Sequence, residues 1–468
     1  MRRSRGTPTS ESLLPLLVVA GLLLPAATFA APERPAVPTV TLAEALRLAD
    51  ERNLDLAAVR QEIDKAAAAV STTWGLVLPI LQGSLEYQHF DHEDSVDLAG
   101  SFAPLLTAMG ITLPPGTSLG DPLVLNRQDQ LHGALTAVLP LINLKSWFTI
   151  GAAQSGEALA ELSFADARQS LLLGVARTFC LTRMAQEVLA LHEGNVRSAE
   201  QHLRVARQRR DAGAGMPIDV IRAETDLEQA RQEHLAARAA LDSARDGLGL
   251  LLDAAAAPLP ATPPAIAAPT EDSAGLERRA LADRTDLAAA RARATLADDQ
   301  LTAAWMEFVP TLELIGNLSH QFTDPPDLGS DDQTRWVLML NIKVPLYDHF
   351  RYATLDERAA SLRQAELQRA ATEKRAALEV RQARRDHETA QASVALAERQ
   401  ANLAREGLAL VEAAYEAGAG ASLDVTEARR LNTAAGVNLA AQRLQAQVAL
   451  LELHRATGRD LRALVEGR

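Results

Sequence analysis

The chain has little of what cross-links or fills the core of an ordinary globular protein. Its 468 residues include one cysteine, Cys180, which excludes an intramolecular disulfide. Only 17 residues are aromatic (nine Phe, four Trp and four Tyr). Alanine, leucine, arginine, glutamate and glutamine dominate, as in long helices that pack through small side chains. The net charge of −13 argues against a nucleic-acid partner.

A long apolar run occurs only near the N-terminus. Arginines at positions 2, 3 and 5 precede the run LLPLLVVAGLLLPAA, and small residues precede a cleavage site after Ala30, so residues 1–30 are predicted to be a signal peptide. Its removal takes away three arginines and one glutamate and moves the net charge from −13 to −15. No cysteine follows the signal, so we expect no N-terminal lipid anchor. The mature chain is expected outside the cytoplasmic membrane.

The sequence contains an internal duplication. Residues 54–79 align with residues 285–310 at an offset of 231, which matches Trp74 with Trp305. The later motifs PLIN and PLYD are 205 residues apart, so an insertion of 26 residues is confined to the first copy. We divide the chain into a signal peptide (1–30), a first repeat (31–252), a Pro- and Ala-rich linker (253–275) and a second repeat (276–468).

Each repeat contains two segments in which apolar and polar residues alternate. This period of two predicts strands, and their length is close to the roughly 9 to 11 residues of a tilted membrane strand. Thirteen of the 17 aromatic residues lie in or beside these segments, as in an interfacial girdle. The pattern alone also fits a soluble antiparallel sheet, but the signal peptide, the aromatic placement and the lack of other β segments favour the membrane. The predicted strands are 81–90, 131–141, 312–322 and 336–346.

Four strands are too few to close into a barrel. An open sheet edge is not tolerated in lipid, because its backbone groups would lack hydrogen-bond partners. Several chains must therefore contribute strands to one barrel, and closed symmetry makes the assembly a homo-oligomer.

Two proline-free stretches predict unusually long helices. Residues from about 148 to 211 and from about 350 to 416 would each form a rod of roughly 100 Å. Residues 217–252 and 422–457 are expected to return antiparallel to these rods. Leucines at 396, 403 and 410 recur every seven residues, which predicts coiled-coil packing. A purely structural coiled coil would leave the four strands unexplained.

A Gly-X-Gly break interrupts the helical sequence once in each repeat. It reads DAGAGMPIDV at 211–220 and EAGAGASLDV at 416–425. The first glycine of each break can adopt positive φ and end a helix, and Pro217 suits the first turn of the next helix. Asp219 and Asp424 fall in that first turn, where a carboxylate interacts favourably with the helix dipole by about 0.3 to 1 kcal/mol.

The second break also places two carboxylates on one helix face. Asp424 and Glu427 are three residues apart, so symmetric copies around a narrow axis would create a negative potential that attracts cations. The first repeat has Arg222 where the second has Glu427, and Arg210 where the second has Tyr415. The two breaks are therefore not electrostatically alike, and these differences indicate where a gate would lie.

Taken together, the motifs resemble those of the TolC-like outer membrane efflux proteins, and the resemblance covers nearly all of the mature chain. It depends on the duplicated order of helix, two strands and long helical hairpin. The sequences that carry it are VLPILQGSLEYQ and FVPTLELIGNL before the strands, PLINLKSW and PLYDHFRY after them, and RRDAGAGMPIDVIRAETDL with AAYEAGAGASLDVTEARRL at the breaks.

This resemblance implies a mainly α fold with a membrane β-barrel portion. Three copies would form one twelve-stranded barrel in outer-membrane lipid, continued by a long α-helical barrel in the periplasm. The implied function is an exit duct of a tripartite efflux or type I secretion system, together with a periplasmic adaptor and an inner-membrane transporter. Such a duct is not an enzyme and needs no cofactor. The alternatives are a periplasmic adaptor or a structural coiled-coil protein of the envelope.

The resemblance also assigns roles to residues at the two breaks. Some members of the family carry an arginine at the position of Gly420, which pairs across the closed gate. Its absence here implies a weaker latch or one built from other residues. The implied periplasmic gate consists of Tyr415, Asp424 and Glu427, and the implied adaptor-docking tips contain Gly213, Gly215, Asp219, Gly418 and Gly420.

Two weaker features remain in the first repeat. His89, His92 and His132 lie near strand ends but lack the ligand spacing of a metal site, so we expect solvated side chains. The loop sequence FAPLLTAMGITLPPG at 102–116 is unusually apolar. It would fold over the barrel mouth, pack between protomers, or form an ordered surface loop without a gating role.

Overall fold

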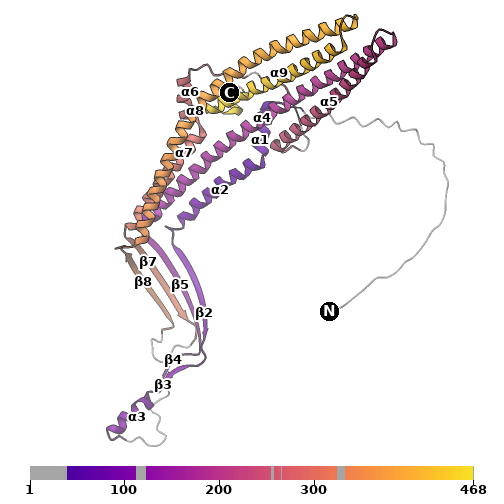
Figure 1. Cartoon of the computed structure of the whole chain (residues 1–468). Coiled ribbons are helices and arrows are strands. Elements are labelled where there is room, and N and C mark those ends of the chain that lie inside the picture. Colours follow the sequence, from indigo (N-terminus) through magenta and orange to yellow (C-terminus); the bar gives the residue numbers. More distant parts are fainter. Residues whose placement is uncertain (1–38, 112–122, 255–257, 265, 324–331, 467–468) are drawn as a thin grey trace, which may run out of the picture. The chain divides into compact units, whose positions relative to one another are not determined.

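Two antiparallel helical hairpins make up most of the computed structural model (Figure 1), which describes residues 39–111, 123–254, 258–264, 266–323 and 332–466. The first hairpin joins α4 (Leu144–Asp211) to α5 (Pro217–Leu252). The second joins α8 (His349–Glu416) to α9 (Ser422–Ala456). The sequence prediction of both long helices and both returning helices is confirmed. The predicted signal peptide lies outside the described residues.

A polar side chain caps the start of each long helix, so α4 begins at residue 144 instead of about 148 and α8 at residue 349 instead of about 350. The Asn143 side chain accepts a hydrogen bond from the Ser146 amide, and Asp348 accepts one from the Phe350 amide. Each long helix then runs for 68 residues. Among the described residues, no helix is long and apolar enough to cross a membrane.

A pair of shorter helices precedes the strands in each repeat. In the first repeat, α1 (Leu42–Arg52) and α2 (Leu54–Trp74) meet at Asn53, whose side chain caps α2 and donates to the Leu251 carbonyl at 3.1 Å. In the second, α6 (Ser273–Asp283) and α7 (Thr285–Trp305) meet at Arg284. The corresponding helices have equal lengths of 11 and 21 residues, so the duplication extends to each helix.

Four long antiparallel strands form one open sheet in the order β2-β5-β7-β8. Their apolar side chains are not covered by the rest of the described chain: Leu81, Leu85 and Trp336 are between 69% and 74% exposed. The two outer strands, β2 and β8, each have one unpaired edge within this sheet. The strands are β2 (Ile80–His89), β5 (Asp129–Ile142), β7 (Thr311–Gln321) and β8 (Thr334–Lys343), which confirms the four predicted segments.

The expectation that the chain has no other β segments is wrong. Strand β1 (Thr39–Val40) pairs in parallel with β6 (Leu259–Pro260), and β3 (Asp94–Val96) pairs with β4 (Leu123–Asn126). Segments of two to four residues are too short to show a period of two, so their pairing depends on tertiary contacts. Helix α3 (Leu98–Ala108) overlaps the first part of the apolar loop sequence at 102–116, and residues 112–116 of that sequence lie outside the described residues.

The predicted leucine heptads do not pack inside the protomer. Leu396, Leu403 and Leu410 are between 62% and 73% exposed. A parallel row of alanines, also spaced by seven residues, is buried instead and allows α8 to approach its neighbours closely. This row consists of Ala376, Ala383, Ala390 and Ala397.

The largest apolar core lies where α1, α4, α5, α9 and α10 (Leu461–Glu466) meet. Leu46, Leu172, Phe179, Leu248 and Leu461 are completely buried there. Cys180 lies in the same core, and burial raises the pKa of its thiol to about 11, so the thiol stays protonated and unreactive at neutral pH.

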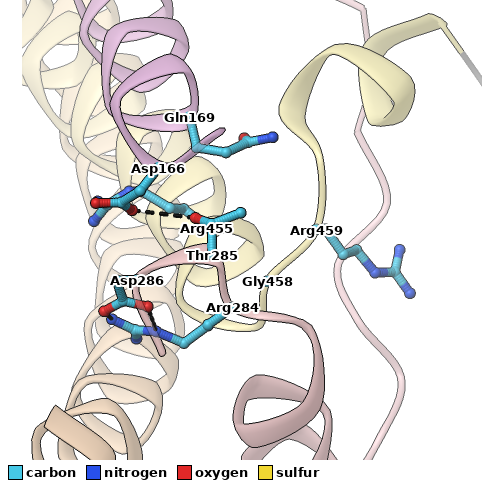
Figure 2. A pocket seen from close by; sticks show the side chains of 8 residues that line it. All are labelled: Asp166, Gln169, Arg284, Thr285, Asp286, Arg455, Gly458 and Arg459. Carbon is cyan, nitrogen blue, oxygen red and sulfur yellow. Dashed lines mark hydrogen bonds and ion pairs between the residues drawn. The ribbon is translucent and has the colours of Figure 1, made fainter. Parts of the chain in front are cut away.

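Charged contacts hold the break between α6 and α7 in place (Figure 2). Arg284 is 7% exposed and binds Asp286 at 2.8 Å, as Figure 2 shows. It also binds Glu379 at 2.7 Å. The Thr285 hydroxyl donates to Asp166 of α4 at 3.1 Å. The Thr285–Asp166 hydrogen bond joins the second repeat to the long helix of the first.

A second charged cluster joins α1, α4 and the C-terminal helix α10. The Asp50 carboxylate accepts hydrogen bonds from Arg168 at 2.6 Å and from Arg462 at 2.7 Å. Burial alone would raise the pKa of Asp50, but the two guanidinium groups outweigh it, and the pKa lies below its ordinary value.

We predict that Asp50→Asn lowers the free energy of unfolding by about 3 kcal/mol, because it leaves two partly buried arginines without their shared carboxylate. The measurement is guanidinium unfolding of the detergent-solubilised protein, followed by circular dichroism at the helix band. The matched control is Glu51→Gln. It breaks the exposed pair with Arg47, for which a loss below about 1 kcal/mol is expected. Equal midpoints for the two variants would contradict this role of Asp50.

Candidate functional site at the hairpin tips

The two hairpins turn through the same backbone conformation. Gly213 has φ +73° and Gly418 has φ +85°, as the sequence predicts. In each turn the residue after this glycine donates its amide to a carbonyl five residues earlier: Ala214 to Arg209 at 2.8 Å and Ala419 to Ala414 at 2.9 Å. Left-handed glycines with this hydrogen bond end helices in a Schellman motif. The two tips are therefore stereochemically equivalent.

The second glycine of each tip is required by close packing. A Cβ atom at Gly215 would lie 2.9 Å from the Arg210 amide nitrogen, and one at Gly420 would lie 3.0 Å from the Tyr415 amide nitrogen. Both obstacles are backbone atoms, which cannot move without shifting the end of the helix. An arginine at position 420 would thus require a different turn.

The acidic residues begin the returning helices, as predicted. Asp219 lies in the first turn of α5 and Asp424 in the first turn of α9. The Asp219 carboxylate is mostly covered and lies 3.9 Å from Arg222. Asp424 is exposed, and Glu427 one turn later is also exposed. The second tip therefore presents two accessible carboxylates on one face of α9.

Glu427 has a partner that the sequence analysis did not consider. Arg430 donates to both carboxylate oxygens of Glu427, at 2.6 and 3.0 Å. This pair lowers the pKa of Glu427 and keeps the carboxylate ionised. Both side chains are more than half exposed, so solvent weakens the pair and the carboxylate can exchange partners.

Tyr415 lies between the two hairpins of one protomer. It is 4% exposed, its ring is 5.0 Å from the His202 ring, and the Arg209 guanidinium lies 4.7 Å above it. Arg209 also donates to the Tyr415 carbonyl at 2.7 Å, which places a positive charge at the C-terminal end of α8. This arginine comes from the first repeat, so a guanidinium meets the second tip although position 420 is glycine.

Arg210 occupies the position in the first repeat that Tyr415 occupies in the second. Its side chain pairs with the adjacent Asp211 at 2.6 Å, and the contact with Tyr415 comes from Arg209 instead. The two arginines are neighbours in a helix, and sequence position alone cannot decide which of them points toward the second hairpin. Arg209 and His202 are therefore site residues that the sequence analysis missed.

The three histidines near the strand ends have separate surroundings. His89 contacts Asp129 at 2.7 Å, His92 contacts Asp91 at 2.8 Å, and His132 contacts Gln130 at 2.9 Å. Within the described part of the chain, no group of three His, Cys, Asp or Glu side chains is placed to hold a metal ion.

An open antiparallel sheet with uncovered apolar side chains, joined to two very long helical hairpins, defines a class of outer-membrane channels. The model of the outer membrane efflux protein family matches residues 45–253 and 276–459, and the chain belongs to this family. The protein is thus an outer-membrane efflux channel and not an enzyme. The first matched range ends at residue 253 and the second begins at residue 276, so the predicted linker lies between them.

Two curated relatives agree with this assignment. The outer membrane protein TolC of Vibrio cholerae is 24% identical over 367 residues, which cover 75% of this chain and 84% of TolC. The outer membrane protein OprJ of Pseudomonas aeruginosa is 29% identical over 299 residues, which cover 62% of each chain.

Solved structures show the same fold. The outer-membrane channel OprN has a TM-score of 0.72 at 19% identity, with 90% of each chain covered. The CmeC outer membrane channel of Campylobacter jejuni has a TM-score of 0.69 at 19% identity, covering 89% of this chain and 85% of its own. VceC of Vibrio cholerae has a TM-score of 0.70 at 18% identity, covering 89% of this chain and 96% of its own.

His202 makes the stability of the tip region depend on pH. The side chain is buried, its Nε2 lies 3.1 Å from the Ser422 hydroxyl, and burial lowers the pKa of the imidazole to about 4. The folded protein disfavours the charged imidazole. The contribution of neutral His202 to the free energy of unfolding is therefore fully present above pH 6.5 and is lost as the pH falls toward 4.

We predict that lowering the pH from 7 to 5 decreases the free energy of unfolding by about 2 kcal/mol through His202. His202→Gln should remove this part of the pH dependence, which chemical unfolding at the two pH values measures. His349→Gln, at an exposed position at the start of α8, serves as the control and should keep the parent's slope. An unchanged slope in the His202 variant would contradict the assignment.

Proposed function

We propose that the protein is the outer-membrane exit duct of a tripartite efflux or type I secretion system, and that it acts as a homotrimer. The observation that carries the proposal is the open four-stranded sheet. Its edges at β2 and β8 are unpaired and its apolar side chains uncovered, which a lipid environment permits only if other copies complete a closed barrel. Three copies would give twelve strands.

The exposed leucines of α8 support the same assembly. Leu396, Leu403 and Leu410 lie on one stripe of a helix whose alanine row already faces the protomer's other helices. An apolar stripe of this length on a charged helix is typical of a helix that packs against a further helix. In a trimer that helix would come from the neighbouring protomer, which would continue the helical barrel.

The hairpin tips are the proposed docking sites for a periplasmic adaptor, which would connect the duct to an inner-membrane transporter. The turn residues Gly213 and Gly418 are exposed, and the exposed side chains of Met216 and Leu423 follow them. Further along the hairpins from the tips, a groove of about 700 Å³ lies between α4, α5 and α9. Its lining includes the polar residues His192, Glu233 and Asn438. The family resemblance and this accessible groove support docking of helical hairpins here.

The second tip is the proposed periplasmic gate. Three copies of Asp424 and Glu427 would bring six carboxylates around the axis and attract cations. Tyr415, fixed by Arg209 and His202, would hold the second tip in the closed position.

We predict that Asp424→Ala with Glu427→Ala reduces cation selectivity and weakens block by divalent cations, because the ring loses its charge. Reversal potentials and single-channel currents in planar bilayers measure both properties. The control is Glu366→Ala with Glu373→Ala, which removes the same charge from α8 far from its tip. If the tip variant retains the selectivity and the divalent block of the parent, the carboxylate ring is not the selectivity filter.

We predict that a photo-crosslinking residue at Ala214 or Ala419 captures the adaptor in intact cells. These positions are exposed and follow the positive-φ glycines, so the turn keeps its conformation. Mass spectrometry of the crosslinked product identifies the partner. The same residue at Gln368, which is exposed on α8 far from the tip, should capture no adaptor. Equal capture from both places would argue against docking at the tips.

A further inference from the structure

The four helices that continue the long strands line one groove. Helix α2 leads into β2, β5 leads into α4, α7 leads into β7 through the helical turn η1 (Met306–Phe308), and β8 leads into α8 (Figure 1). The helices pack in the order of the strands: α2 against α4, α4 against α7, and α7 against α8. Residues from all four helices line a groove of about 530 Å³. The row of helices is therefore curved, and the groove lies on its concave side.

The groove starts close to the sheet and follows the helices away from it. Thr73 is one residue before the end of α2, and Lys145 is the second residue of α4. From Lys145 to Gly156, the last lining residue on α4, the helix advances by about 16 Å. The volume lies within the range of small-molecule sites, roughly 300 to 1,000 Å³. An elongated molecule of small size therefore fits this groove.

Three of the helices contribute small apolar residues to the lining. Leu296 of α7 adds a larger apolar side chain, and Gly156 adds space, because a Cβ atom there would have no heavy atom within 4 Å. Such a surface offers apolar contacts to a hydrocarbon body. The small residues of α2, α4 and α7 include Ala66, Ala69, Ala152, Ala153, Ala303 and Ala304.

The groove also contains three charged residues, two of which pair with each other. Lys145 binds Glu307 at 2.6 Å, so their charges offset one another. Arg358 of α8 is half-buried and donates from Nη1 to the side-chain oxygen of Gln300 at 2.9 Å. Within the described residues, no carboxylate forms an ion pair with Arg358. The lining therefore carries one uncompensated positive charge.

The chemistry of Arg358 selects the kind of group that this charge would bind. A guanidinium presents five N–H donors in a planar fork, and one of them is engaged by a neutral amide oxygen here. The other donors suit a carboxylate, sulfonate or phosphate, which can accept two parallel hydrogen bonds. The groove thus combines an anion-binding end on α8 with an apolar wall on the other three helices.

We propose that the groove binds an anionic amphiphile, whose acidic group pairs with Arg358 and whose hydrocarbon body lies against the alanines of α2, α4 and α7. The inference rests on the proposed function. In a closed ring of three copies the concave sides of the helix rows face the axis, so the groove lies on the inner wall of the duct. Its ligand is therefore cargo in transit and not a lipid of the surrounding membrane.

The first test measures the binding of two fluorescent amphiphiles to the full-length protein in lipid nanodiscs. One is dansyl-undecanoate, an anion at neutral pH, and the other is a dansylated undecyl chain that ends in trimethylammonium. Dansyl emission reports transfer to an apolar site, and nanodiscs without protein give the background. We expect the parent to bind the anion about tenfold more tightly than the cation, because only the anion pairs with Arg358.

Two variants identify the site, and each has a matched control. Arg358→Gln should weaken binding of the anion about tenfold and leave the cation unaffected. Gly156→Leu fills the groove and should abolish binding of the anion. The control Arg363→Gln breaks an exposed pair with Glu366, and the control Gly151→Leu adds the same bulk to α4 outside the groove. Both controls should bind the anion as the parent does.

Channel currents in planar bilayers decide on which wall the groove lies. Sodium laurate, added below its micellar concentration to the side of the helices, should lower the current of the parent. It should lower the current of Arg358→Gln much less, and bilayers without protein give the leak. A parent that binds dansyl-undecanoate but whose current laurate does not change would place the groove on the outer surface and overturn the proposal.

Failure of the site and failure of the duct give different results. A parent that forms no channels would contradict the proposed duct, whatever the fluorescence shows. In a conducting parent, equal affinity for the two dansyl probes would overturn the site alone. The same holds if the parent and Arg358→Gln bind the anion equally.

Discussion

Backbone hydrogen bonding in the membrane is the constraint on which the rest of the architecture depends. The sheet ends at β2 and β8, and in hydrocarbon an unpaired strand edge leaves several polar groups without partners. One chain therefore carries only a fraction of the strands of a barrel. The helices that continue the strands likewise leave apolar side chains uncovered. The exposed leucines of α8 and the uncovered side chains of the sheet are the surfaces that other copies would cover in the proposed trimer.

The duplication provides two hairpins whose long helices are equal in length but whose tips differ in chemistry. Both tips use a left-handed glycine followed by a glycine that admits no Cβ, so their backbone is shared. The charges differ: the first tip pairs Asp219 with Arg222, and the second exposes Asp424 beside the Glu427–Arg430 pair. Equivalent scaffolds with unlike surfaces would allow one hairpin to serve as the fixed support and the other to carry the proposed gate.

The sequence predicts the long helices and the four long strands because each has a strong local signal, namely caps, glycine turns or alternation. It fails where a local signal is absent or ambiguous. The leucine heptads of α8 are apolar in pattern yet exposed, because alanine occupies the face that packs. Arg429 is one of several arginines on α9, and only the positions of Asp226 and Asn195 on other helices show that it is buried. The roles of Tyr415, Asp424 and Glu427 remain predictions.

The equal length of α4 and α8, 68 residues each, limits how the chain can change. Adding one residue to a helix advances its tip by about 1.5 Å and turns it by about 100°, which would misalign every contact between the hairpins. The α9 residues from Ser422 to Gly436 that contact α4 would then meet its wrong face. Viable insertions in one long helix must be matched in the other, whereas the 26 additional residues between the first two long strands needed no counterpart. The two long helices must therefore keep equal lengths, and length variation is confined to the loops.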